Sequence, residues 1–249
     1  PDVVSNESYD GSSWTEIANL SVARSYHAGF GTQTAAMEVG GSPGATVTAE
    51  KWNGTSWTEV GDLNVGRDGT GGCGTTTAGL YIGGDSSPGA SIDSVESYDG
   101  SSWTEIADLN QARRSQATGG IQTAAIIASG QFYPPSATKS ETELWNGTAW
   151  TEVADVNTAR QAQGGSCQGT TTAFLMFGGS APPRKTETEE WDGVSWTEVA
   201  DLPAAISEHS GTGTASLALA MGGRVASPST VRVATEEWIV PQNVEIITD

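Results

Sequence analysis

A tryptophan recurs along the chain at nearly constant intervals, and each recurrence brings the same local phrase. The phrase reads YDGSSWTEIADL at residues 98–109, and close copies occur in the other repeats. Successive tryptophans are separated by 43, 46, 47 and 46 residues. A period of this length indicates an array of one supersecondary unit that cannot bury its apolar face alone. The tryptophans that define the period are Trp14, Trp57, Trp103, Trp150 and Trp196.

The unit at residues 67–109 predicts four short strands. The small and β-branched residues DGTGGCGTTT are followed by the apolar segment AGLYIGG, which ends in a diglycine. A Pro/Gly/Ser loop leads to the alternating segment SVESY, and the turn dipeptide Asp99-Gly100 joins it to WTEIA. No run of ten or more residues has the apolar spacing of a helix. We therefore expect an all-β chain of meandering four-stranded units.

The chain ends predict how the array closes. The third-strand phrase occurs six times, and its last copy, EEWIVPQNVEIITD, has Asn243 where the tryptophan belongs. An isolated N-terminal hairpin would leave the Trp14 side chain without a neighbouring sheet to pack against. We therefore expect the strand at residues 14–18 to complete the blade begun by residues 207–238, so that the terminal strands share the closing sheet and no edge is exposed. The alternative is a six-bladed or incomplete array.

The repeat resembles the kelch repeat, which has a diglycine after a strand, then an aromatic residue, then Trp, and Arg ten residues after that Trp. The resemblance implies a β-propeller like the central domain of galactose oxidase. We expect one domain at residues 1–249, with five blades at about 20–62, 63–108, 109–155, 156–201 and 202–249, the last closed by 1–19. Blade three departs from the pattern with Ser129-Gly130, and blade five has Ile206 in place of Arg. SYDGSSW (residues 8–14) also resembles a shortened Asp-box, which is a structural turn.

The arginines of the repeat could surround the propeller axis and bind a carboxylate, as in a sialidase. The kelch resemblance instead implies a structural hydrogen bond or ion pair between blades. The recurrent Glu of the third strand is a plausible partner that we expect to lie further out. These arginines are Arg24, Arg67, Arg113 and Arg160.

The formal charge of −19 excludes some classes of partner. An acidic surface repels phosphate backbones and anionic lipid, so nucleic acid and membrane surfaces are poor partners. No apolar stretch reaches about 18 residues, so no membrane-spanning helix is expected.

The two histidines are the only candidates for a metal site of the oxidase type. His27 and His209 occupy equivalent repeat positions, and in a closed five-bladed ring they would lie on neighbouring blades. The equivalent residues elsewhere are Thr70, Gln116 and Gln163, which are not ligands of that type. A firm zinc or copper site needs three or four ligands. We expect no metal and no other cofactor, and a polar rim at the channel mouth.

No catalytic set stands out from the repeat. No Asp or Glu departs from the pattern, and no nucleophile-elbow motif is present. We therefore predict that the chain is not an enzyme. The alternative is a carbohydrate-active oxidase or glycoside hydrolase that uses the channel mouth.

The loops between the second and third strands vary most, and variable loops on a rigid scaffold are the usual place for recognition. We predict a non-catalytic binding or structural module, extracellular or on a phage virion, that recognises a glycan or a protein receptor, or contacts other virion or surface proteins. An intracellular adaptor fits the acidic, Gly-rich composition less well. The candidate binding residues are Phe132, Tyr133, Arg184 and Arg224 in the loops, and His27, His209, Gln116 and Gln163 at the rim.

Overall fold

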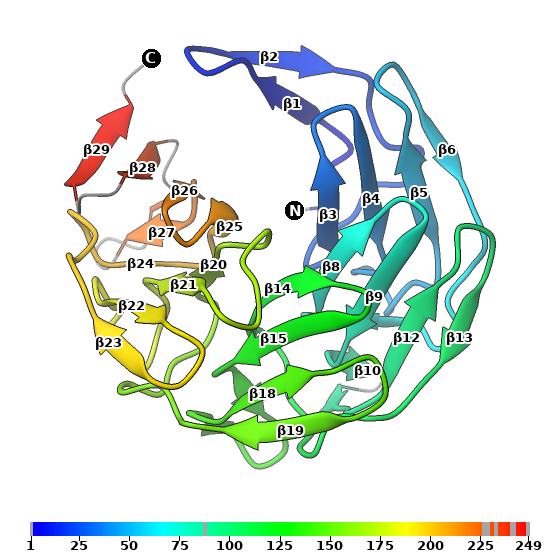
Figure 1. Ribbon diagram of the computed structural model, residues 1–249. Helices are drawn as coiled ribbons and strands as arrows, with labels where there is room; N and C mark the ends of the chain where they lie inside the picture. Colours follow the sequence, from blue (N-terminus) through cyan, green and yellow to red (C-terminus); the bar gives the residue numbers. More distant parts are fainter. Residues whose placement is uncertain (1, 87–88, 226–229, 232–233, 240–242, 248–249) are drawn as a thin grey trace.

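The computed structural model describes residues 2–86, 89–225, 230–231, 234–239 and 243–247. Its strands form five four-stranded antiparallel sheets, which surround a central axis as the blades of a β-propeller (Figure 1). Within each sheet the strand order follows the chain order, from the axis to the rim. Among the described residues, no helix is long and apolar enough to cross a membrane.

Each blade is built from one repeat. Blade one contains β3 (Ala28–Thr32), β4 (Ala35–Val39), β5 (Ala49–Trp52) and β6 (Trp57–Glu59). Blade two contains β8 (Gly71–Thr75), β9 (Ala78–Ile82), β12 (Val95–Tyr98) and β13 (Trp103–Glu105). Blade three contains β14 (Ala117–Ile121), β15 (Ala124–Ala128), β18 (Thr142–Trp145) and β19 (Trp150–Val153). Blade four contains β20 (Gly164–Gly165), β21 (Phe174–Phe177), β22 (Thr188–Trp191) and β23 (Trp196–Glu198). Blade five contains β25 (Ser210–Thr214), β26 (Leu217–Met221), β28 (Thr235–Ile239) and β29 (Asn243–Ile247).

Short strand pairs or single β-bridges join the connection before each blade to the loop after its second strand. In blade two, β7 (Arg67–Asp68) pairs with β10 (Asp85–Ser86), which also pairs with β11 (Ala90–Ser91). In blade five, β24 (Ile206–Ser207) pairs with β27 (Arg224–Val225). Blade three carries β16 (Gln131–Phe132) and β17 (Ala137–Thr138). The connection that follows the repeat's Arg and the variable loop therefore lie on one face of the propeller.

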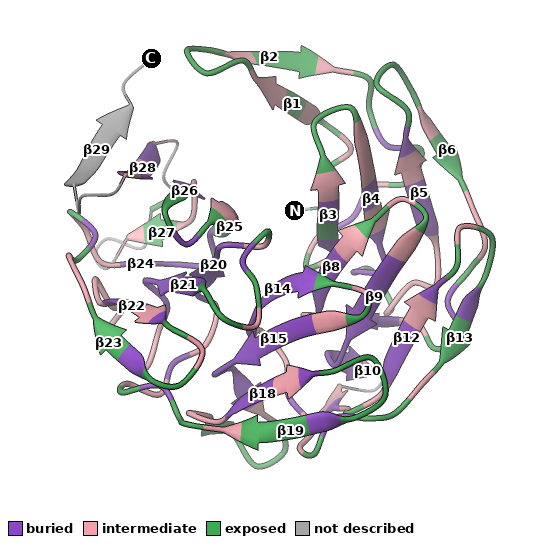
Figure 2. Ribbon diagram, in the orientation of Figure 1, coloured by how far each residue is buried: buried purple, intermediate pink, exposed green. Residues whose placement is uncertain are grey.

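The apolar core lies between the blades. Leu80 and Ile82 of β9 are fully buried against Trp145 and Trp150 of blade three. Figure 2 shows that buried residues concentrate in the inner strands and exposed residues in the outer ones. Small residues near the axis allow neighbouring blades to lie close together. A Cβ on Gly72 would lie only 2.8 Å from the Phe30 ring of blade one, which is too close for a larger residue.

The recurrent arginine makes a buried ion pair within its own blade in blades one to four. In blade two, Arg67 Nη1 lies 2.6 Å from Glu96 Oε1, and Arg67 also donates to the Tyr81 carbonyl at 3.2 Å. The third-strand Glu is therefore the partner of this arginine, and it lies on the third strand from the axis, as expected. The equivalent pairs are Arg24–Glu50, Arg113–Glu143 and Arg160–Glu189.

The arginine carbonyl, rather than the guanidinium, joins successive blades. The second glycine of each diglycine donates its amide to the carbonyl that opens the next blade, as Gly84 does to Arg113 at 2.8 Å. The same bond runs from Gly41 to Arg67, from Gly130 to Arg160 and from Gly179 to Ile206.

The expected sharing of the closing blade by the two chain ends is wrong. Residues 235–239 of β28 pair with residues 243–247 of β29, so blade five obtains its outer strand from the chain that directly follows. The N-terminal strands β1 (Asn6–Tyr9) and β2 (Trp14–Ile17) form a separate two-stranded sheet. Figure 1 shows this hairpin between blade five and blade one. A short connection brings β29 to β28 at little entropic cost, whereas β2 would have to pair across the whole chain.

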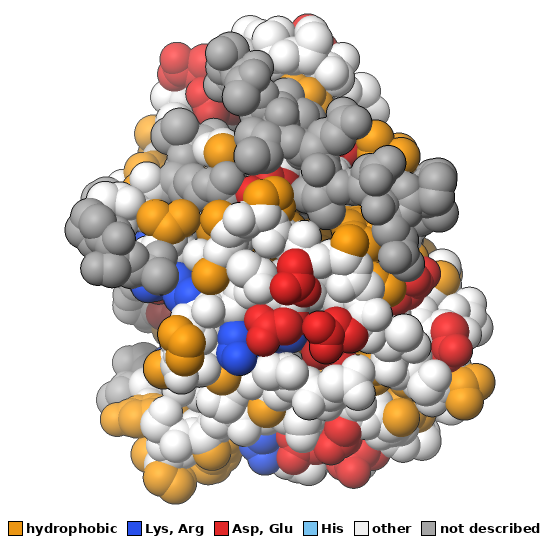
Figure 3. Space-filling model, turned by 90° about the vertical axis from the view of Figure 1, so that its left-hand side faces the viewer, with side chains coloured by type: hydrophobic (Ala, Val, Ile, Leu, Met, Phe, Trp, Pro, Cys, Tyr) orange, Lys and Arg blue, Asp and Glu red, His pale blue; other side chains and the backbone are white. Residues whose placement is uncertain are grey.

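Each repeat adds one exposed negative charge to the outer rim. The Glu of each Trp-Thr-Glu phrase points to solvent, and Figure 3 shows acidic side chains grouped on the side of the ring that carries blades four and five. The exposed glutamates of this phrase are Glu16, Glu59, Glu105, Glu152 and Glu198.

Candidate functional site

A ring of left-handed residues surrounds the propeller axis. The residue two places after the repeat's Arg has a φ between 52° and 62° in all five blades, a region that most side chains avoid. In blades two to five, the amide of this residue donates to the carbonyl of its counterpart in the preceding blade, over 2.7 to 2.9 Å. Inter-blade hydrogen bonds thus hold the strained backbone in place. The ring consists of Tyr26, Gly69, Ser115, Ala162 and Glu208.

The ring borders a cavity of about 940 Å³ on the loop face of the propeller. Five of the eight predicted binding residues line it: His27, Gln116, Gln163, Arg184 and His209. The other three, Phe132, Tyr133 and Arg224, do not.

Two glutamines of the cavity wall have amide groups of fixed orientation. Gln116 and Gln163 are 7% and 6% exposed. Their Nε2 atoms donate to the carbonyls of Ile82 and Ala128 in the preceding blades, at 2.8 and 3.2 Å. These bonds decide which end of each amide is the oxygen. Neither Oε1 atom has a hydrogen-bond partner among the described residues.

The two histidines have different partners and different chemistry. His27 Nε2 lies 3.0 Å from Glu38 Oε2. Burial lowers the pKa of His27, but the charge and hydrogen bond of Glu38 raise it more, and the net shift is upward. His209 Nε2 instead accepts from the Gly164 amide at 3.0 Å, and its ring packs on Phe177.

The expectation that His27 and His209 sit on neighbouring blades is wrong, because the β1–β2 hairpin lies between blades one and five (Figure 1). Within the described part of the chain, no group of three or more His, Cys, Asp or Glu side chains is placed to hold a metal ion.

Arg114 organises the cavity edge between blades two and three. Its guanidinium pairs with Asp85 and donates to Gln131 Oε1 at 2.9 and 2.7 Å. It also lies over the Tyr133 ring, 5.5 Å from the centroid. Burial and the charge of Asp85 raise the pKa of Asp68, and Arg114 opposes them. The cavity wall therefore contains a carboxyl group that holds its proton more firmly than usual.

Two of the remaining predicted loop residues, Tyr133 and Phe132, belong to the loop at this edge, and the third, Arg224, lies in blade five. Tyr133 is 42% exposed and contacts the cavity wall through Arg114. Phe132 packs beneath Lys139, whose Nζ lies 5.9 Å from the ring centroid. Arg224 forms an ion pair with Glu208, at 2.9 Å between Nε and Oε2. Glu208 is one of the five left-handed residues around the axis.

The lining residues that sequence reasoning missed include Tyr26, Asp68, Arg114 and Glu208. A signal for them was present in the repeat. The two positions after the Arg slot differ in almost every unit although the slot itself is nearly constant. Positions that vary between repeats while the scaffold stays constant are the usual places for binding residues.

Comparison with known proteins establishes the fold alone. The structure reported as "Structure of YjhT" is similar to this chain with a TM-score of 0.78, over 99% of this chain and 97% of that chain, at 12% sequence identity. The sequence matches no protein-family model, and a search of curated proteins gives no match. The expected all-β propeller of four-stranded antiparallel blades is confirmed.

Proposed function

We propose that this propeller is a non-catalytic kelch-type module that binds a glycan in the cavity on its loop face. The observation that carries the proposal is the polar cavity of the loop face, whose wall contains Gln116 and Gln163 with buried amide oxygens that have no hydrogen-bond partner among the described residues. A buried acceptor without a partner costs about 1–3 kcal/mol, so each oxygen favours a ligand that brings a donor. Carbohydrate hydroxyl groups are such donors.

The shape of the site favours a glycan over a flat protein surface. A volume of about 940 Å³ lies within the range of small-molecule pockets. Imidazole, amide, hydroxyl and charged groups from all five blades line it, and Tyr26, which is 63% exposed, offers an aromatic face at the mouth. A rigid concave polar site of this kind suits one or two sugar rings.

The kelch assignment is part of the proposal. It is supported by the buried Arg–Glu pair of four blades and by the diglycine amide that reaches the next blade. We also place the module outside the cell or on a virion surface. The acidic rim and the Gly-rich composition support this location, which cell and virion fractionation would test.

A glycan array followed by titration calorimetry on the bound sugar tests the function. The double variant Gln116→Leu, Gln163→Leu keeps the side-chain size but removes both acceptors, and we expect it to weaken binding by about tenfold or more. Glu105→Gln on the exposed rim is the matched control and should bind as the unmodified chain does. Equal affinity in the double variant, or an empty array, rejects the proposal.

A second candidate, hydrolysis of the bound glycan, is favoured by Asp68. Its raised pKa makes it a possible proton donor, and it faces the same cavity as Arg114. Asp68→Asn should then abolish turnover on a glycoside panel and leave binding intact. Absence of turnover by the unmodified chain on every sugar that it binds eliminates this candidate.

A further inference from the structure

Two of the hairpin turns that carry the repeated phrase begin with Asn-Gly, whereas the other three begin with Asp-Gly. The pairs are Asn53-Gly54 in blade one and Asn146-Gly147 in blade three, and the sequence contains no other Asn-Gly pair. All four residues are exposed. Each turn joins a third strand to a fourth, so it lies on the face of the propeller opposite the loops between second and third strands. A change at these turns is therefore remote from the cavity of the loop face.

The side-chain oxygen of each of these asparagines accepts three hydrogen bonds. Asn146 Oδ1 accepts from the Thr148 amide at 2.9 Å, from the Thr148 hydroxyl at 2.8 Å and from the Ala149 amide at 2.9 Å. Asn53 Oδ1 accepts the equivalent three bonds over 2.8 to 2.9 Å. Donors held on a carbonyl oxygen stabilise the negative charge that develops there when a nucleophile attacks the carbonyl carbon. The turn therefore makes the side-chain carbon Cγ more electrophilic.

The glycine that follows each asparagine supplies an unhindered nitrogen. Neither Gly54 nor Gly147 donates its amide in a hydrogen bond within the described residues. Their φ angles are 95° and 94°, a region that residues with a side chain rarely adopt. A Cβ on Gly54 would have only the Thr34 carbonyl oxygen within 4 Å, at 3.5 Å. Solvent can therefore reach this amide and remove its proton, and no side chain shields it.

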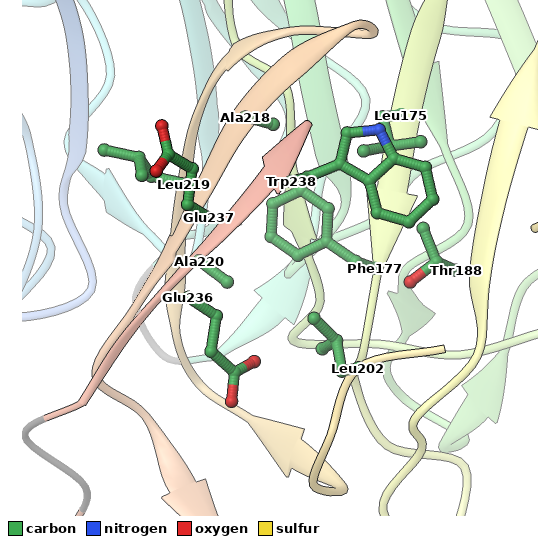
Figure 4. A pocket seen from close by; sticks show the side chains of 10 residues that line it. All are labelled: Leu175, Phe177, Thr188, Leu202, Ala218, Leu219, Ala220, Glu236, Glu237 and Trp238. Atoms are coloured by element: carbon green, nitrogen blue, oxygen red, sulfur yellow. The ribbon is translucent and has the colours of Figure 1, made fainter. Parts of the chain in front are cut away.

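A buried tryptophan directly before each asparagine anchors the hairpin in its blade. Trp52 and Trp145 are 5% and 4% exposed, and their Nε1 atoms donate to backbone carbonyls at 3.0 and 2.9 Å. Figure 4 shows the equivalent ring of blade five, Trp238, beside Leu175 and Phe177 of blade four. The exposed turn can therefore react while the sheet beneath it stays folded.

We propose that Asn53 and Asn146 are sites of spontaneous deamidation in the folded protein, and that Asn146 reacts faster. The nitrogen of the following glycine attacks Cγ of the asparagine. The bond between that nitrogen and Cγ forms, the bond between Cγ and Nδ2 breaks, and ammonia leaves with the glycine amide proton. Water then opens the cyclic imide at either of its carbonyl groups, which gives aspartate or isoaspartate. Each event consumes one water molecule, releases one ammonia molecule and needs no oxidant or reductant.

The repeat already contains the aspartate form of this turn. Asp99 Oδ1 accepts from the Ser101 amide, the Ser101 hydroxyl and the Ser102 amide, each at 2.8 Å. The aspartate product of Asn53 or Asn146 would therefore keep the turn and add one negative charge. The isoaspartate product would not fit in the same way, because it lengthens the backbone by one carbon atom and displaces the donors from the carboxylate.

The two sites form a matched pair that differs in one hydrogen bond. The chain reads WNGTSWTEV at residues 52–60 and WNGTAWTEV at residues 145–153, so that Ser56 stands where blade three has Ala149. Asn53 Nδ2 donates to Ser56 Oγ at 3.2 Å, whereas the Ala149 side chain offers no acceptor to Asn146. Nδ2 is the group that leaves, and its bond must break before the side chain turns toward the glycine nitrogen. One neutral hydrogen bond of this kind corresponds to about fivefold in rate.

Peptide mapping by mass spectrometry tests the proposal on the folded chain, incubated in mildly alkaline buffer below its melting temperature. We expect both sites to convert from amide to acid, with Asn146 about fivefold faster than Asn53. Ser56→Ala should raise the rate at Asn53 to that of Asn146. The reciprocal variant, Ala149→Ser, should lower the rate at Asn146 to that of Asn53. In the urea-denatured chain the two sites should react at the same rate, because their sequence neighbours are alike.

Three results overturn the proposal. One is a folded chain in which both asparagines stay intact while the denatured chain converts. Another is equal rates at the two sites of the folded chain, or rates that the two reciprocal variants leave unchanged. The third is a difference in rate that persists in urea. Asn64 is the internal control that should stay intact, because its Nδ2 donates to Glu96 Oε2 at 2.8 Å and the β-branched Val65 follows it. Circular dichroism melts of both variants verify that the fold is unchanged.

Discussion

Arg113 Nη2 lies 2.7 Å from Glu143 Oε1, and neither side chain has exposed surface. The guanidinium also donates to the carbonyls of Ser129 and Glu141, at 3.2 and 2.7 Å. Burial lowers the pKa of Arg113, and Glu143 opposes this shift. A buried charge of this kind is tolerated because a partner and carbonyl oxygens replace water.

Breaking this pair on one side should be costly. Glu143→Gln leaves the guanidinium buried without its counter-charge and should lower the free energy of unfolding by about 3–5 kcal/mol. Blade five, with Ile206 in the Arg slot, shows that an apolar residue fits there. The double variant Arg113→Ile, Glu143→Gln should therefore lose less stability than Glu143→Gln alone. Urea denaturation of both variants measures this, and a larger loss in the double variant contradicts the role of the buried charge.

The Asp-Gly turns should make stability sensitive to acid. The Ser102 amide, the Ser101 hydroxyl and the Ser101 amide hold the pKa of Asp99 at about 2, below its ordinary 3.8. Because the folded pKa is lowered, this contribution is complete above pH 3.8 and is lost as the pH falls through about 2. Asn53 accepts the equivalent bonds without a charge.

Replacing the turn aspartates by asparagine should remove that sensitivity. We expect the triple variant Asp10→Asn, Asp99→Asn, Asp192→Asn to melt near the unmodified chain at neutral pH, and to lose less of its melting temperature between pH 4 and pH 2. Thermal melts followed by circular dichroism across that range test the expectation. Parallel pH profiles for the two proteins would show that the acid response arises elsewhere.

Glu38 should control the titration of His27. In Glu38→Gln the remaining influences are burial and the charge of Arg24, which both lower the pKa of His27. The raised pKa means that the His27–Glu38 pair stabilises the fold below about pH 6.5 and loses this effect as the pH rises through the folded value. An NMR titration of the imidazole protons should show His27 moving downward in Glu38→Gln, with His209 as the internal control. An unchanged His27 titration contradicts the pairing.

Two equivalent glycines should respond differently to alanine. A Cβ on Gly211 would lie 2.6 Å from the Gly165 backbone of blade four, whereas on Gly29 it would meet only Glu38 Oε1, at 2.8 Å. Gly211→Ala should cost about 1–3 kcal/mol of unfolding free energy through overpacking. Gly29→Ala should be neutral or slightly stabilising, because the unfolded chain loses freedom. Equal losses in the two variants would mean that blade one is covered on both sides.

The four-stranded repeat could be predicted because residues close together in the sequence determine each of its strands and turns. Alternating apolar residues, the turn at Asp99-Gly100 and the diglycine at Gly83-Gly84 specify four strands within one unit. Units that must bury their apolar faces on each other then form a ring. The polar channel mouth could also be predicted from the sequence. Four residues that share one place in the repeat line the same cavity: His27, Gln116, Gln163 and His209.

The ends of the array and the partners of the charged residues were decided by the tertiary structure. The strands around Tyr9 and Trp238 carry the same local phrase, so the phrase did not decide between them. The strand pairings of the structure show that β29 completes blade five and that β1–β2 forms a separate sheet. In the same way, the contact of Arg114 with Asp85 of the preceding blade depends on the distance between two different repeats. A periodic sequence defines the unit and its neighbours, whereas the closure of the ring and the chemistry of its axis arise from contacts that no single repeat contains.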